Sequence, residues 1–205
     1  MSPADPREPI AERDAIRQAA LAKRAALDPD AVRRWGDAIA ARTLTLLAER
    51  GDETVFAYLD MPNEVPTRAI VAALLHDGRR VVVPRVVRGS QAMTLHAIDD
   101  LERDLRPGLW GIPTPRRRCP QVDPASVDVA LVPCVAFDGE GYRIGHGGGF
   151  YDRFLTAYPH VYAIGLAFEW QRVPTCLPQP WDVPLDALVT EAGVWTFRRE
   201  GPRPR

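Results

Sequence analysis

The chain has 205 residues, of which 46% are hydrophobic and 26% are charged, and its formal net charge is −1. These values are ordinary for a water-soluble globular protein, and the near-neutral charge argues against binding of nucleic acid through bulk electrostatics. No apolar run approaches the ~20 residues that a membrane-spanning helix requires, so we expect no association with a membrane.

The length suits a single domain, which we place at residues 10–197. We expect residues 1–9 and 198–205 to be disordered tails, the second of them basic. Residues 1–9 lack the apolar core of a secretory signal, and the three cysteines form no Cys-x-x-Cys pair. Sparse cysteines of this kind indicate reduced thiols, so we expect a cytoplasmic protein. We also expect a monomer.

Two helices are predicted at the start of the chain. Residues 10–27 are rich in alanine and arginine, which favours a helix, and Arg13 and Arg17 within it share one face. The spacing leaves two interpretations open, a solvated face or a clamp that holds an anion. A second helix is expected to begin at Asp28, a capping residue followed by proline, and to end at Gly51.

The first predicted strand, residues 54–59, is followed by a candidate binding carboxylate, Glu64. A helix is expected next, over residues 68–77, and Gly78 ends it. In open α/β sheets, ligands bind beyond the carboxyl ends of the strands, which favours a binding role for Glu64. The alternative is a surface carboxylate that the N-terminus of the next helix stabilises.

Two further apolar runs, residues 80–84 and 93–98, predict two more strands. Residues 105–119 are rich in proline, so we expect an irregular segment there. Trp110 within it would either cover a flat aromatic ligand or fix the loop to the body of the protein.

A glycine-rich loop, residues 139–149, is the most informative part of the chain. It lies between a predicted strand at 127–133 and a predicted helix at 150–158. Glycine adopts positive φ, so the N–H groups of such a loop can turn toward one point, where the helix N-terminus adds partial positive charge. This arrangement is typical of a phosphate site, and the flanking Arg143 and Arg153 could pair with phosphate oxygens. The alternative is a tight turn between strand and helix.

The rest of the chain adds two candidate metal ligands. Asp152, in the first turn of the helix, could hold the magnesium ion that accompanies a nucleotide, and Asp182 could be a metal ligand or a turn residue. Final strands are predicted at 161–168, 187–190 and 194–197. Because strands and helices alternate, we predict a three-layer α/β/α fold with a mostly parallel central sheet.

The glycine-rich loop also carries a resemblance to a known family. Its motif is Arg143-x-Gly145-x-Gly147-Gly148-Gly149-Phe150-Tyr151-Asp152-Arg153, preceded by Val135-Ala136-Phe137-Asp138. This motif resembles the signature of the 5-formyltetrahydrofolate cyclo-ligase family. Further matches occur in the family's order at residues 61–67, 111–115, 165–171 and 177–186.

The resemblance implies an enzyme that depends on ATP and Mg²⁺ and converts 5-formyltetrahydrofolate into 5,10-methenyltetrahydrofolate, with release of ADP and phosphate. The γ-phosphoryl group would be transferred to the formyl oxygen, and N10 would then attack, close the ring and expel phosphate. The protein would mainly position the two substrates and stabilise charge.

The resemblance also implies roles for individual residues. ATP would be held by Arg13, Arg17, Arg143, Ile144, Gly145, His146, Gly147, Gly148, Gly149, Phe150 and Tyr151. The folate would be bound by Leu59, Glu64, Trp110, His146 and Phe150. Asp152 and Asp182 would bind Mg²⁺, and Arg143 would be catalytic because it offsets charge as the phosphoryl group moves.

Several positions depart from the family pattern. Arg13 stands where lysine is common, and His146 occupies a variable position that is often basic. Phe150 stands where tyrosine is frequent, Thr114 where Glu or Gln is common, and Trp181 where histidine often precedes the aspartate. They motivate a second hypothesis, a regulatory protein that binds ATP or folate without turnover. A third is an enzyme for a phosphate-bearing substrate on a similar fold, such as a sugar-phosphate isomerase or a CoA transferase, which would use no ATP.

Overall fold

The computed structural model describes residues 8–86, 93–108 and 111–197. The helices are α1 (Glu8–Ala25), α2 (Pro29–Arg50), α3 (Arg68–His76) and α4 (Phe150–Ala157), with short 3-10 helices at Pro124–Ser126 and Glu169–Gln171. The strands are β1 (Thr54–Phe56), β2 (Arg80–Val86), β3 (Met93–Ile98), β4 (Leu105–Pro107), β5 (Pro113–Pro115), β6 (Gln121–Val122), β7 (Val129–Pro133), β8 (Ala136–Phe137), β9 (Arg143–Ile144), β10 (Tyr162–Leu166), β11 (Ala187–Val189) and β12 (Val194–Thr196).

A single large sheet forms the middle of the molecule, with the strand order β12-β11-β10-β7-β1-β2-β3-β6. The five inner strands from β11 to β2 run parallel to one another. The outer strands β12, β3 and β6 are antiparallel to their neighbours. The sheet is therefore mostly parallel, as the alternation of strands and helices predicts.

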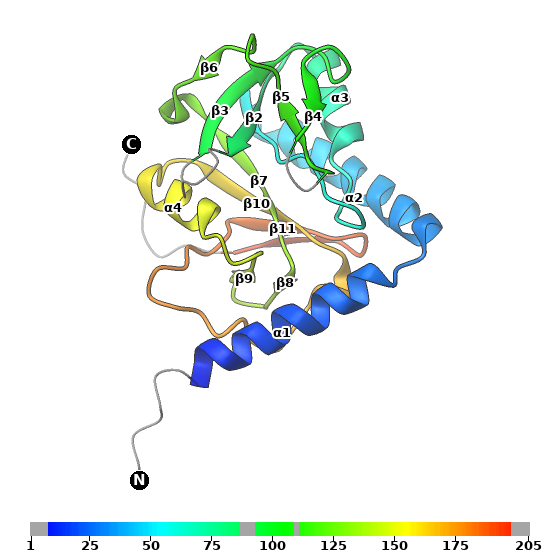
Figure 1. Cartoon of the computed structure of the whole chain (residues 1–205), viewed down its shortest axis with the longest axis vertical. Helices are drawn as coiled ribbons and strands as arrows, with labels where there is room; N and C mark the ends of the chain where they lie inside the picture. The colour runs from blue at the N-terminus through cyan, green and yellow to red at the C-terminus, as the bar shows by residue number, and fades with distance from the viewer. Residues whose placement is uncertain (1–7, 87–92, 109–110, 198–205) are drawn as a thin grey trace.

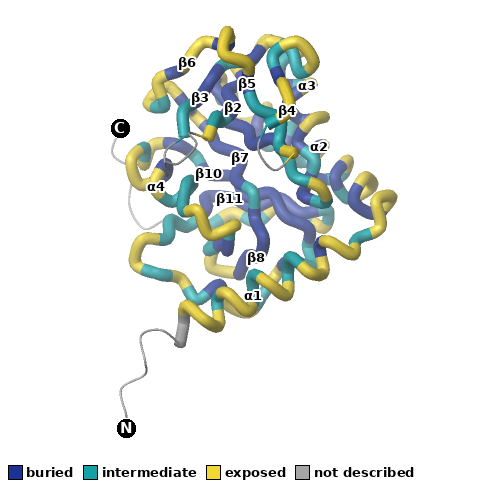
Figure 2. Tube along the Cα trace, viewed as in Figure 1, coloured by how far each residue is buried: buried dark blue, intermediate teal, exposed yellow. Residues whose placement is uncertain are grey.

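Successive residues of the inner strands face opposite sides of this sheet, because side chains alternate along a strand. Val55 and Ala57 of β1 and the segment after it pack in one core cluster with apolar residues of α2 and α3. Phe56 packs in a second cluster with Phe154 of α4. Helices thus cover both faces of a buried sheet, and the predicted three-layer α/β/α fold is confirmed (Figures 1 and 2).

The second helix begins and ends where local capping chemistry predicts. The Asp28 side chain accepts hydrogen bonds from the N–H groups of Asp30 and Ala31, and Gly51 closes the helix in the left-handed conformation at φ 71°. Trp35 on this helix packs on Phe168, with ring centroids 5.5 Å apart, so it belongs to the core.

Several segments differ from the prediction. Helix α1 begins at Glu8 and ends at Ala25, whereas the sequence predicts residues 10–27, and the β8–β9 hairpin lies between β7 and the glycines that precede α4. Residues 105–119 are not irregular throughout, because β4 and β5 pair as an antiparallel ribbon with Leu105 opposite Pro115. Prolines in both strands hide this pairing in the sequence, since proline lacks the N–H that a ladder uses. The first strand ends at Phe56, whereas the apolar run predicts an end at residue 59.

The sheet topology places two loops at the same edge. Strands β1 and β7 are parallel neighbours, so their carboxyl ends point the same way. The loop after β1 carries Glu64, and the segment after β7 passes through the β8–β9 hairpin into α4. Helix α1 crosses this edge and lies against β8 (Figure 1).

None of the helices in the described part of the chain combines the length and the apolar character that crossing a bilayer requires.

Candidate active site

The backbone N–H groups of the loop between β9 and α4 have no hydrogen-bond partner in the described part of the chain. We call residues 143–151 the glycine cradle. Gly147 has φ 93° and Gly149 has φ 63°, conformations that favour glycine, and Gly149 is the N-cap of α4. Within the described residues, the N–H groups of residues 145–152 donate no hydrogen bond. The last of these belong to the first turn of a helix, where intrahelical partners are lacking.

Two arginines hold carbonyl groups of the cradle. Arg17 Nε donates to the Gly145 carbonyl at 2.8 Å, and Arg153 Nη2 donates to the Gly148 carbonyl at 2.8 Å. In a trans peptide the C=O and the following N–H point in opposite directions. These bonds therefore turn the N–H groups of His146 and Gly149 away from the arginines and leave them available to a ligand.

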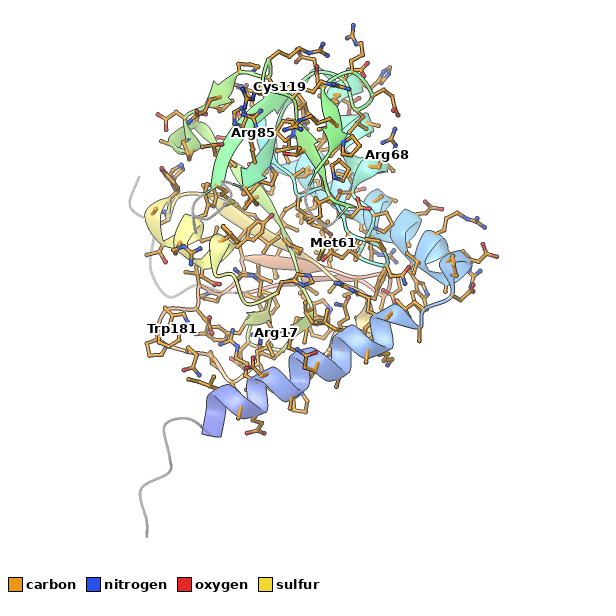
Figure 3. The ribbon with its side chains drawn as sticks, viewed as in Figure 1. Arg17, Met61, Arg68, Arg85, Cys119 and Trp181 are labelled. Atoms are coloured by element: carbon orange, nitrogen blue, oxygen red, sulfur yellow. The ribbon has the colours of Figure 1, made fainter. Side chains whose placement is uncertain are left out.

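Helix α1 brings both of its predicted arginines to the cradle. Arg13 Nη2 donates to the Arg143 carbonyl at 3.3 Å, while Arg17 contacts Gly145 as described. Arg13 also forms an ion pair with Asp182, 169 residues further along the chain. The interpretation of this helical face as merely solvated is therefore wrong, since it packs on the cradle (Figure 3, where Arg17 is labelled).

A hollow of about 470 Å³ opens beside the cradle. It is lined by Gly147, Gly148, Gly149, Asp152, Arg153, Thr156, Ala157 and Trp181. Trp181, labelled in Figure 3, is 64% exposed, and Gly147 and Gly148 are exposed as well, so solvent reaches the loop. The cradle is consequently an accessible surface and is not sealed beneath side chains.

The two predicted metal ligands lie in neighbouring segments. Asp152 Oδ1 accepts hydrogen bonds from Arg143 Nη2 at 3.0 Å and from the Val183 N–H at 3.2 Å. Asp182 Oδ2 is paired with Arg13 and accepts from the Gln179 N–H at 2.8 Å, so Asp182 also shapes a turn. The Asp152 bond to Val183 brings the segment that contains Asp182 to the start of α4.

The donor set fits magnesium that is bound partly by a substrate. Across residues 8–86, 93–108 and 111–197, no group of three or more His, Cys, Asp and Glu side chains is arranged to hold a metal ion. However, each of these two carboxylates bonds to the described residues through one oxygen, and its other oxygen bonds to none of them. Mg²⁺ usually takes one or two carboxylates and completes its shell with phosphate oxygens and water.

Arg143 is buried at the base of the cradle. Its Nη1 donates to the Val183 carbonyl at 2.8 Å and its Nη2 donates to Asp152. The side chain of Ile144 is also fully buried, so Ile144 contributes its backbone to the site. Arg143 therefore supplies positive charge from beneath the loop, at a position fixed by two hydrogen bonds.

Glu64 is 7% exposed, so the alternative of a surface carboxylate is wrong. Its Oε1 accepts hydrogen bonds from His146 Nε2 at 2.8 Å and from Arg24 Nη1 at 3.2 Å. Its Oε2 accepts the Met61 N–H at 2.9 Å. The predicted folate residue Glu64 and the cradle residue His146 thus meet directly, because β1 and β7 end at the same edge of the sheet.

The charge of Glu64 affects buried groups around it. Burial, followed by the negative charge of Glu64, raises the pKa of both Tyr58 and Tyr151 well above the usual range. Burial also raises the pKa of the Cys134 thiol to about 12, so this cysteine is a neutral core residue and not a nucleophile. Tyr151 stacks on Phe56 at 5.5 Å, which fixes the first turn of α4 to the sheet.

The predicted apolar walls are only partly defined by the structure. Leu59 is buried in the same core cluster as Val65, close in sequence to Glu64. The Phe150 ring lies over Gly148, where an added Cβ would come within 2.7 Å of it, and the Arg153 guanidinium stands 5.2 Å from the ring centroid. Trp110 falls outside the described residues.

Sequence reasoning missed two groups that support the site. Arg24 contacts Glu64 and carries no local signal, since it is one arginine among several in α1. Gln171 is buried and donates from Nε2 to the carbonyls of Cys134 and Val135, where β7 leads toward the cradle. Gln171 falls within residues 165–171, which match the family pattern, and this match is the signal that could have identified it.

Comparisons with known proteins identify relatives of this chain. Residues 9–191 match the model of the 5-formyltetrahydrofolate cyclo-ligase family. The chain is 33% identical over 178 residues to the 5-formyltetrahydrofolate cyclo-ligase of Escherichia coli K12, an alignment that covers 85% of this chain and 98% of that protein. The corresponding protein of Saccharomyces cerevisiae is 30% identical over 192 residues, covering 82% of this chain and 90% of the yeast protein. The solved structure of Aquifex aeolicus 5,10-methenyltetrahydrofolate synthetase superposes with a TM-score of 0.80 at 28% identity, covering 94% of this chain and 96% of that one.

Proposed function

Because this chain belongs to the 5-formyltetrahydrofolate cyclo-ligase family, we propose that it converts 5-formyltetrahydrofolate into 5,10-methenyltetrahydrofolate and uses ATP to do so. The single observation that carries the ATP-dependent part is the row of N–H groups from residue 145 to residue 152 that donate to none of the described residues. Such a row at a helix N-terminus favours bound phosphate.

The triphosphate would lie along the cradle, from Gly145 to Tyr151, in the hollow beside Gly147. Arg13 and Arg17 support this arrangement from α1, because they hold backbone carbonyls and leave the N–H groups facing the ligand. Their positive charges also lie close enough to lower the electrostatic cost of a polyanion in the hollow.

Arg143 is the residue to which we assign charge stabilisation during phosphoryl transfer. The γ-phosphoryl group leaves ADP and bonds to the formyl oxygen of the folate. The N10 amine then attacks the formyl carbon and loses its proton, the carbon–oxygen bond breaks, and inorganic phosphate departs. Arg143 is held by Asp152 and Val183, so its charge is already in place when negative charge moves across the phosphoryl oxygens.

Asp152 and Asp182 are the residues that we propose to hold Mg²⁺. Each has a carboxylate oxygen that makes no hydrogen bond to the described residues. When bound, the ion would neutralise phosphate charge and orient the triphosphate. Asp182 would contribute only if its ion pair with Arg13 opens or is shared with the ion.

The folate would be bound beside Glu64. A carboxylate can accept two hydrogen bonds from the aminopyrimidine edge of a pterin. We assign Leu59 and Phe150 to the apolar walls, and Trp110 remains a predicted wall residue. His146 contacts Glu64 and belongs to the cradle, so it lies where the two substrates would meet.

We further propose that residues 10–197 form one domain that acts as a monomer in the cytoplasm. The three cysteines are free and buried, which suits a reducing compartment. The small-molecule substrates need no nucleic acid or membrane partner.

The test is the absorbance change that accompanies formation of the methenyl product. We expect the change only when purified protein, 5-formyltetrahydrofolate, ATP and Mg²⁺ are all present, with one ADP released per product. No change in the complete mixture contradicts the proposal. ATP-independent turnover contradicts the role of the cradle, and tight binding without ADP release would favour a regulatory protein.

A magnesium titration tests the metal residues. Asp152→Asn keeps an acceptor for Arg143 and Val183 but removes the negative charge, so it should raise the Mg²⁺ concentration for half-maximal rate by about tenfold or abolish turnover. Asp37→Asn, at an exposed position of α2, is the matched control and should behave as the unsubstituted chain. An unchanged titration of Asp152→Asn rejects the assignment.

A further inference from the structure

We propose that Arg24 is a positioning residue for the folate site: it holds the carboxylate of Glu64 in the orientation that receives the pterin. This inference rests on the proposed function and extends it to a residue in the last turn of α1. No local pattern in the sequence marks this residue, and its role follows from where α1 ends in the fold.

The contact between the two side chains is buried on both sides. Arg24 is 9% exposed and Glu64 is 7% exposed, and Arg24 Nη1 donates to Glu64 Oε1 at 3.2 Å. A buried carboxylate without a cation is strongly unfavourable, and the Arg24 guanidinium supplies a buried cation to Glu64.

A second hydrogen bond joins the end of α1 to the loop that carries Glu64, and in this bond the loop is the donor. The side-chain amide of Asn63 donates from Nδ2 to the backbone carbonyl of Arg24 at 3.1 Å. Asn63 has φ 61°, and the Glu64 N–H closes a turn onto the Met61 carbonyl at 3.0 Å. The loop that carries Glu64 is therefore fixed to the end of α1 through both its backbone and its carboxylate.

The geometry distinguishes this role from ordinary helix stabilisation. A basic residue in the last turn of a helix interacts favourably with the helix dipole. Lys23 is in the same turn, but its ammonium lies over the ring of Trp170, 4.7 Å from the centroid. Arg24 instead reaches a carboxylate 40 residues away and comes within 3.5 Å of His146 Nε2.

Arg24 and His146 both bond the same oxygen of Glu64, but they are held differently. The arginine is buried and its main chain is bonded to Asn63, whereas the His146 side chain is 37% exposed on the glycine cradle. Arg24 is consequently the fixed partner of Oε1. It sets the direction in which the other carboxylate oxygen faces, and so the geometry of a two-point contact with an aminopyrimidine.

The experiment compares three variants in a calorimetric titration with 5-formyltetrahydrofolate and in steady-state kinetics. Arg24→Met removes the charge and keeps the apolar stem, so we expect folate binding at least tenfold weaker and the KM for folate raised similarly. The KM for ATP and the kcat at saturating folate should stay within about twofold. Arg24→Lys keeps the charge and should recover part of the affinity. Arg33→Met, at an exposed arginine of α2 paired with Asp30, is the control and should match the unsubstituted chain.

The outcomes separate this inference from the proposed function. The positioning role is overturned if Arg24→Met leaves both the folate affinity and the KM for folate unchanged. It is also overturned if Arg24→Met lowers only kcat or only the unfolding temperature. If Arg24→Met fails to fold, Arg24→Lys decides: its folate affinity should fall severalfold, and wild-type affinity overturns the inference. If the unsubstituted chain binds folate without turnover while Arg24→Met binds it more weakly, the positioning role stands and the catalytic proposal fails.

Discussion

The resemblance assigns His146 to the folate site, but its contact with Glu64 predicts that it competes with the folate. Replacement of His146 by alanine should therefore strengthen the binding of 5-formyltetrahydrofolate in the absence of nucleotide. A carboxylate offers about four acceptor positions. In Glu64, Arg24 and His146 use the two acceptor positions of Oε1, and the Met61 N–H uses one acceptor position of Oε2. A two-point contact with an aminopyrimidine needs a position on each oxygen, so one partner of Oε1 has to leave.

His146 is the partner that leaves, because its side chain is 37% exposed on a glycine loop. Arg24 is buried and is held by two hydrogen bonds, one from its side chain to Glu64 and one from Asn63 to its carbonyl. A hydrogen bond to a charged group contributes about 1.5–3 kcal/mol when it is shielded from water. The exposure of the ring reduces this to about 1 kcal/mol. Since about 1.4 kcal/mol corresponds to a factor of ten, removal of the competing imidazole should tighten folate binding about fivefold.

Calorimetry with 5-formyltetrahydrofolate and no nucleotide measures this effect. His160→Ala is the matched control, because His160 is exposed and bonds only the Ala125 carbonyl among the described residues, so its affinity should not change. A non-hydrolysable ATP analogue should reduce the difference between His146→Ala and the unsubstituted chain, since phosphate in the cradle offers the imidazole N–H another acceptor in place of Glu64. Unchanged or weaker folate binding by His146→Ala refutes the competition.

Three further predictions concern the frame of the site. The Asp138 carboxylate accepts three backbone hydrogen bonds, two in its own turn and one from Cys176, so Asp138→Ala should lower the free energy of unfolding by about 3 kcal/mol in urea titrations; a loss below about 1 kcal/mol contradicts this. Asn63 has φ 61°, so Asn63→Ala should be about 1 kcal/mol less stable than Asn63→Gly, and equal stabilities would argue against strain at this turn. Burial raises the pKa of Cys134 from its usual value to about 12, so the folded chain keeps this thiol protonated while the unfolded chain ionises near pH 9. Alkylation of Cys134 at pH 9, followed by peptide mass analysis, should be slow until denaturant is added, and the free energy of unfolding should fall as pH rises from about 9 toward 12; rapid alkylation in the folded state contradicts the burial.

The cradle was predictable because its features are local. The strand before it, the glycines at 147 and 149 and the helix that begins at Phe150 all follow one another within a short stretch. The ends of α2 were predictable for the same reason, since Asp28 caps neighbouring N–H groups and Gly51 closes the last turn. The α/β class followed from the regular alternation of apolar runs. The β4–β5 ribbon was not predictable, because its prolines remove the pattern that identifies paired strands.

By itself, the sequence determined the alternation of the main strands and helices, the glycine-rich loop before α4 and the family to which the chain belongs. Only the tertiary structure decided which charged groups meet. Arg13 pairs with Asp182 across 169 residues, and Arg24 pairs with Glu64 across 40. Periodicity and capping depend on neighbours within a few residues, so they are visible in the sequence. These ion pairs depend on where α1 crosses the sheet edge and on the parallel alignment of β1 and β7, which the packing of the whole domain sets.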